Sequence, residues 1–80
     1  MQLMQLTKDL NQSIHKLEYA VGKAKTLSAL KDIRSYAGAL VHPLTDEISK
    51  TIDMIEKRKG KITSEDLQLI QQLCKKLKEQ

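Results

Sequence analysis

The strongest constraint on this chain is a short break between two apolar stripes, at residues 57–66, which carries the signals for ending one helix and starting another. Lys57, Arg58 and Lys59 place positive charge where the carbonyl end of a helix carries partial negative charge. Gly60 can adopt the left-handed backbone conformation that closes such an end. The pattern therefore predicts that one helix ends here and that the chain turns back.

A start signal follows directly. Thr63 can cap a new helix, and Asp66, three residues later, approximates a capping box with an acid shorter than the usual Glu. Ile62 can pack on Leu67 as a hydrophobic staple. Leu69 lies beside the stripe that this last helix is predicted to bury, which consists of Leu67, Ile70, Leu73, Cys74 and Leu77.

Two earlier helices are predicted from apolar side chains that recur every three or four residues. The first spans residues 3–24, and its stripe is Leu3, Leu6, Leu10, Ile14, Leu17, Val21 and Ala24. The second can be capped by Thr26 or Ser28, and its stripe is Leu27, Leu30, Ile33, Ala37, Leu40 and Val41. Because the spacing barely breaks between them, these two helices could also run together as one bent rod.

Pro43 marks a firmer boundary. The residue before a proline disfavours the helical region, whereas a proline suits the first position of a helix. The second helix should therefore end near His42. The third should begin with Pro43 and bury Leu44, Ile48, Ile52 and Ile55.

Short connections make neighbouring helices antiparallel. The sequence therefore predicts an all-α protein that folds as an antiparallel four-helix up-down bundle, with left-handed packing and helix crossing angles of about 20°. With 80 residues, the chain has room for a single domain, residues 1–80. A dimer of long helical hairpins is the competing architecture. The pattern leaves open whether the chain is a monomer or a homodimer.

Composition narrows the classes of function. The net charge of +4 is carried by twelve Lys and only two Arg, and Tyr19 and Tyr36 are the only aromatic residues. Nucleic-acid readers usually add arginine forks and stacking aromatics, so sequence-specific recognition of nucleic acid is not favoured. The single cysteine, the absence of a long apolar run and the polar residues after position 6 predict a soluble, cytoplasmic protein.

The sequence offers little catalytic chemistry. Cys74 shares the apolar stripe of the last helix, where a free cysteine usually packs as a small hydrophobic group. His15 and His42 have no partner at the spacing of metal ligands. No nucleophile, base and oxyanion donor can be assembled from these residues. We therefore expect neither an enzyme nor a metal or cofactor site.

The second half of the chain resembles a known family. Pro43 and Leu44, the apolar series Ile48, Ile52 and Ile55, and the run Lys61-Ile62-Thr63-Ser64-Glu65-Asp66-Leu67-Gln68-Leu69-Ile70-Gln71-Gln72-Leu73 are similar in pattern to the immunity proteins of pediocin-like (class IIa) bacteriocins. Members of that family are small, usually basic, cytoplasmic four-helix bundles with a loop of the type Lys-Leu-Thr-x-Glu before the last helix. The resemblance covers mainly residues 43–77.

The resemblance implies a non-enzymatic protein that protects the producer of a bacteriocin. It would act at the cytoplasmic side of the bacteriocin's membrane receptor, a mannose-type sugar permease, by binding the bacteriocin–receptor complex. Specificity in the family is associated with the C-terminal half. The contact residues that the resemblance indicates here are Lys57, Arg58, Lys59, Lys61, Gln68, Gln71, Lys75 and Lys78.

Two other classes of function remain open. One is a small nucleic-acid-associated regulator, in which a hairpin dimer presents lysines to phosphates and binds with a steep salt dependence. The other is an adaptor that offers a groove of the bundle to a partner helix and exposes an apolar patch. The partner itself is not identified by the sequence.

Overall fold

Four α-helices follow one another through residues 3–79, which are the residues that the computed structural model describes. They are α1 (Leu3–Glu18), α2 (Lys23–Ala39), α3 (Thr45–Lys57) and α4 (Ser64–Glu79). No strand occurs within this described part of the chain. The prediction of an all-α fold is confirmed.

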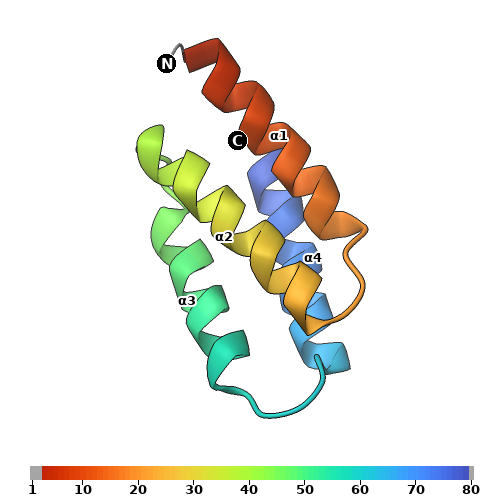
Figure 1. The fold of residues 1–80 in the computed structure, drawn as a ribbon. Helices are drawn as coiled ribbons and strands as arrows, with labels where there is room; N and C mark the ends of the chain where they lie inside the picture. The colour runs from red at the N-terminus through yellow and green to blue at the C-terminus, as the bar shows by residue number, and fades with distance from the viewer. Residues whose placement is uncertain (1–2, 80) are drawn as a thin grey trace.

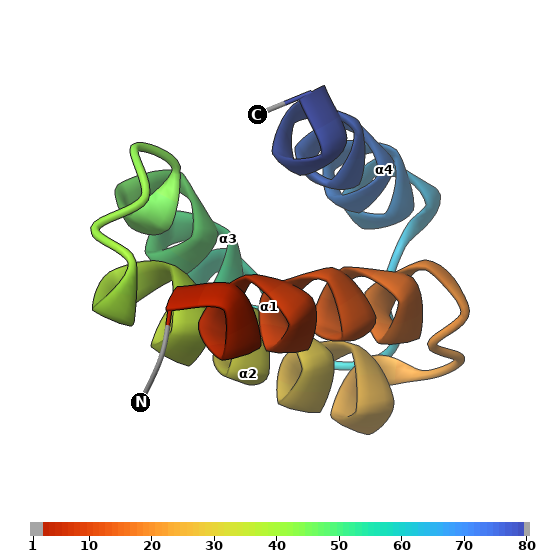
Figure 2. The ribbon, with the colours of Figure 1, turned by 90° about the horizontal axis from the view of Figure 1, so that it is seen from above.

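The helices form an antiparallel up-down bundle (Figure 1). Each helix packs on its neighbour in the chain, and α1 also packs on α4, so the four helices close into a ring. Figure 2, a view from above, shows α1 and α2 lying side by side with α3 and α4 across from them. The two described ends lie at the same end of an elongated body that measures 39 × 21 × 21 Å.

The core is aliphatic, as the composition predicts. Burying one Leu or Ile side chain contributes about 1.5–3 kcal/mol, so a chain of this size depends on filling these positions well. Half-buried Tyr36 is the only aromatic side chain packed against this core in the described chain. The buried apolar residues are Leu10, Ile14, Leu17, Ala29, Leu30, Ile33, Ala37, Ile48, Ile52, Ile55, Ile70, Leu73, Cys74 and Leu77.

The first two helices are separate, and the predicted boundary at residue 24 is wrong. Helix α1 ends at Glu18, and Gly22 adopts φ 91° and ψ 160°, a backbone region that is essentially restricted to glycine. The turn that this conformation makes leaves Val21 81% exposed and Ala24 exposed, so neither joins the predicted stripe. The single bent rod is therefore excluded.

The predicted caps of α2 and α3 also differ from the observed ones. Thr26 lies inside α2, where its Oγ1 donates to the Gly22 carbonyl at 2.8 Å, and Gly22 itself is the N-cap. Helix α3 begins at Thr45 instead of Pro43. The two residues before Thr45 form a turn, in which the Leu44 N–H donates to His42 Nδ1 at 3.1 Å.

Helix α2 ends in a backbone motif that places a valine in an unfavourable conformation. The Val41 N–H donates to the Gly38 carbonyl at 3.1 Å and the His42 N–H donates to the Ala37 carbonyl at 2.9 Å, which is a Schellman arrangement. This arrangement requires a positive φ, and Val41 has φ 54°. Val41 is 86% exposed, so its predicted place in the apolar stripe of α2 is wrong.

We expect Val41→Gly to raise the free energy of unfolding by about 1 kcal/mol, because glycine adopts this conformation without the clash of a β-branched side chain. The measurement is urea unfolding followed by circular dichroism. Val21→Gly is the matched control, since Val21 is equally exposed but has no positive φ. A stabilisation of the same size in both variants, or in neither, would contradict strain at Val41.

Candidate functional site

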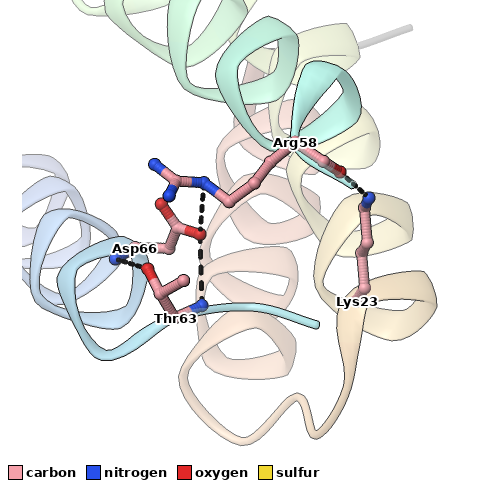
Figure 3. Close-up of polar contacts among 4 residues, drawn as sticks. All are labelled: Lys23, Arg58, Thr63 and Asp66. Atoms are coloured by element: carbon pink, nitrogen blue, oxygen red, sulfur yellow. Dashed lines mark hydrogen bonds and ion pairs between the residues drawn. The ribbon is translucent and has the colours of Figure 1, made fainter. Parts of the chain in front are cut away.

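The junction between α3 and α4 is held by a small polar network (Figure 3). The Thr63 N–H donates to Asp66 Oδ2 at 3.2 Å, and the Asp66 N–H donates to Thr63 Oγ1 at 3.2 Å. This reciprocal pair is the predicted capping box, which is confirmed. Arg58 Nε lies 3.2 Å from Asp66 Oδ2, and Lys23 Nζ donates to the Arg58 carbonyl at the end of α3.

Gly60 has φ 92°, so the predicted positive φ in this loop is confirmed. The residue that closes α3 is a different one, because the C-cap is Arg58 in an extended conformation whose N–H donates to the Ile55 carbonyl. Gly60 instead turns the loop two residues later. The helix end is therefore stabilised by the lysine from α2 that bonds the Arg58 carbonyl.

Asp66 is a fully buried acid, with none of its surface exposed. Its Oδ1 has no hydrogen-bond partner within the described chain. The Arg58 side chain is 39% exposed and supplies the neighbouring positive charge. An acid in this position is tolerated only when it is paired, so Arg58, one of the predicted contact residues, already has a structural partner.

The other predicted contact residues are exposed but do not form one patch. One group surrounds the α3–α4 loop, and the other lies along α4 and ends near the opposite end of the bundle (Figure 1). Lys78 Nζ is paired with Glu18 Oε2 of α1 at 2.6 Å. The loop group is Lys57, Lys59 and Lys61, and the helix group is Gln68, Gln71, Lys75 and Lys78.

One hollow lies between α1 and α4, and a second lies beside it, between the α1–α2 loop, the start of α2 and the α3–α4 loop. The first hollow, of about 330 Å³, includes Gln71, Lys75 and Lys78 in its walls, together with Leu17, Glu18, Ala20, Thr26, Leu67, Ile70 and Cys74. The second hollow, of about 630 Å³, is lined by Ala20, Val21, Gly22, Lys23, Thr26, Gly60, Lys61, Ile62 and Leu67. The two hollows adjoin and are together called the groove, because three residues line both: Ala20, Thr26 and Leu67.

Leu67 was predicted to be buried and to receive Ile62 as a staple, but it is 46% exposed. The inward positions of α4 are Asp66, Ile70, Leu73, Cys74 and Leu77. Because Asp66 occupies the first inward position, the next residue, Leu67, projects toward the groove. Ile62 is half-buried against the core. Sequence reasoning missed the groove because it assigned this position of the stripe to Leu67 instead of to the acid.

Cys74 lies in the wall of the groove but is only 4% exposed. Burial raises the pKa of its thiol to about 11, the charge of Glu18 adds to this increase, and the charge of Lys78 opposes it. The thiol is therefore protonated at neutral pH and is a weak nucleophile. Packing in the core, as the sequence predicted, accounts for this residue.

Both histidines make local contacts. His15 Nδ1 lies 3.6 Å from Glu18 Oε1, and His42 accepts a backbone hydrogen bond. Within residues 3–79, no three His, Cys, Asp or Glu residues lie close enough to hold a metal ion. No helix in the same range combines the length and apolar character needed to cross a bilayer.

Comparison with known proteins found no matching protein-family model, no matching curated protein and no matching solved structure.

The Asp66–Arg58 pair predicts unequal effects of its two members on stability. Arg58→Ala leaves a buried carboxylate without its cation and should lower the free energy of unfolding by about 2–3 kcal/mol. Asp66→Asn keeps an acceptor for the Thr63 N–H and frees a guanidinium that can be hydrated, so it should cost about 1 kcal/mol. Urea unfolding at pH 7 measures both. A larger loss for Asp66→Asn than for Arg58→Ala would contradict this assignment.

The raised pKa of Cys74 predicts slow alkylation of the native protein. A shift from 9.0 to about 11 reduces the thiolate fraction at pH 8 by about 100-fold, so iodoacetamide should react correspondingly faster in denaturing urea. Equal alkylation rates in native and denatured protein would contradict the burial of the thiol.

The same shift predicts a pH dependence of stability. Above pH 9 the unfolded thiol releases its proton while the folded thiol retains it, so the free energy of unfolding falls as the pH rises from 9 to 11. Cys74→Ala should lose that part of the pH dependence.

Proposed function

We propose that the protein is a non-enzymatic immunity protein of the pediocin-like bacteriocin type, which acts in the cytoplasm by binding a complex of bacteriocin and membrane receptor. The observation that carries this proposal is the groove. Its α4 wall belongs to the half of the chain, residues 43–77, that resembles the family. The groove supplies a recessed, partly apolar surface on which a protein partner could pack.

The arrangement of the groove supports a binding role on physical grounds. Leu67 is held half-exposed on a helix whose rotation is set by the buried Asp66. An apolar side chain that is partly exposed at rest gains free energy when a partner covers it, about 25 cal/mol for each Å² of apolar surface removed from water. Because the side chain is presented by a rigid helix, little conformational entropy is lost on binding. Binding, not group transfer, is the activity that these residues favour.

The proposed function predicts protection. Expression of the chain inside a bacteriocin-sensitive Gram-positive strain should raise survival against one or two members of a panel of pediocin-like peptides. The control is the empty vector, and the folded state of the expressed protein is checked by circular dichroism after purification. Survival that matches the empty vector across the panel, with folded protein present, would count against the immunity function.

The contribution of the basic loop is tested in the same strain. Lys57→Glu combined with Lys61→Glu should reduce protection if the loop meets the receptor complex, since both side chains are exposed. Lys8→Glu combined with Lys50→Glu is the matched control, because these lysines are also exposed and lie outside the predicted contact residues. Full protection by the loop variant would remove the loop from the mechanism and leave the α4 residues as the contact surface.

A further inference from the structure

The groove exposes apolar side chains from two parts of the chain. Val21, in the α1–α2 loop, is 81% exposed, and Leu67, in the first turns of α4, is 46% exposed. Both line the larger hollow, and Leu67 continues into the smaller one beside Ile70. The apolar strip of the groove therefore consists of Val21 and Leu67, since Ile70 itself is only 5% exposed. Exposed apolar strips with charged borders are typical of surfaces that bind another protein.

Two of the residues that line both hollows have small side chains. They are Ala20 and Thr26, and Leu67 is the third residue that lines both. The two ends of α4 are fixed, by the network around Asp66 at its start and by the Lys78–Glu18 pair near its end. The first contact is the stronger one, because the Lys78–Glu18 pair is partly exposed and contributes little by itself. A rigid groove of this kind is available to a partner without rearrangement of the bundle.

The charges along the groove are mostly positive. Lys23, Lys61, Lys75 and Lys78 line it, whereas Glu18 is its only acid and is already paired with Lys78. Within residues 3–79, Lys61 and Lys75 form no ion pair. These two cations border the apolar strip at its two hollows. A complementary partner therefore carries apolar side chains flanked by acids.

The backbone of the groove walls indicates the conformation of the partner. Nearly all wall residues of the smaller hollow belong to α1, α2 and α4, whose N–H and C=O groups are largely satisfied inside the helices, whereas the larger hollow is lined mainly by the α1–α2 and α3–α4 loops. Such walls offer no free sheet edge to which an extended strand could add. A helical partner satisfies its own backbone and needs only side-chain contacts. Helix-in-groove binding is the recognition mode that fits these walls.

We propose that this groove binds an amphipathic α-helix whose apolar stripe is bordered by Asp or Glu residues. The inference rests on the proposed protein-binding function and names the chemistry of the partner. Apolar anchors at spacings of three and four would cover Leu67 and Val21. Acids on the flanks of the helix would pair with Lys61 and Lys75.

The test uses a fluorescein-labelled synthetic peptide of about 18 residues, long enough to form a helix, with leucines at spacings of three and four and glutamates on both sides. Two control peptides have the same composition in scrambled order or lysine in place of each glutamate. Fluorescence anisotropy with the full chain should show saturable binding of the first peptide only. Equal binding of either control peptide would overturn the proposal.

Matched variants locate the binding site. Leu67→Gln should weaken binding about tenfold, whereas Leu69→Gln should leave it unchanged. The two leucines are 46% and 44% exposed on the same helix, but Leu69 lines a different hollow, between α3 and α4. Lys61→Glu with Lys75→Glu should weaken binding by a similar factor, and Lys8→Glu with Lys50→Glu, which are exposed outside the groove, should not. Thermal unfolding verifies that each variant is folded.

Other occupants give different results. If Leu67→Gln and Leu69→Gln weaken binding equally, the groove is not the site. If sedimentation shows self-association that Leu67→Gln abolishes, the occupant is a second copy of this chain. If a nucleic-acid duplex binds with a steep salt dependence, and Leu67→Gln does not change that binding, the lysines bind phosphates instead. Each of these results overturns the proposal.

The protection assay separates this inference from the proposed function. If the wild-type chain protects cells and Leu67→Gln protects as well as Leu69→Gln, the groove proposal fails while the immunity function stands. If the wild-type chain does not protect but the acidic peptide binds with the expected pattern of variants, the groove proposal stands and the immunity function fails.

Discussion

The buried carboxylate of Asp66 sets the position of the last helix. Its Oδ2 accepts the Thr63 N–H at the start of α4 and lies beside the Arg58 guanidinium at the end of α3, so one side chain joins two helices. An unpaired charge in this position would cost several kcal/mol, and the loop is therefore constrained to bring Arg58 to it. Because Asp66 points inward, the apolar residue that follows it points outward. The groove depends on that rotation.

Helix α4 is attached to the other three helices by a smaller packed surface than those helices share with each other. The pairs α1–α2 and α2–α3 pack closely through aliphatic side chains, whereas α4 packs less extensively on α1 and α3. Polar contacts at both ends of α4 complement this narrower apolar contact. Lys78 reaches Glu18 near its C-terminal end, and Lys76 Nζ reaches Glu47 Oε1 of α3 at 2.7 Å. Exposed pairs of this kind contribute little individually, so the network around Asp66 carries most of the polar anchoring.

Local signals in the sequence predicted much of this fold. The apolar periodicity located four helices, and the capping residues Thr63 and Asp66 form the predicted box because a capping box depends only on residues three positions apart. The errors arose at helix ends, where the local backbone conformation and not the apolar spacing decides. Periodicity alone could not show that Gly22 interrupts a continuing stripe, or that a Schellman motif would force Val41 to a positive φ. The predicted contact residues were identifiable as polar positions, but their division into two groups follows from the bundle.

The small side chains in the groove bear on how such a protein can evolve. A half-buried Ala20 beside an exposed Leu67 is a position where a larger aliphatic residue would extend the core and add packing energy. A chain selected for stability alone would be expected to fill that space. A larger residue that filled this space would also close part of the surface between α1 and α4. In the proposed binding role, stability and recognition would therefore be opposed at this one position.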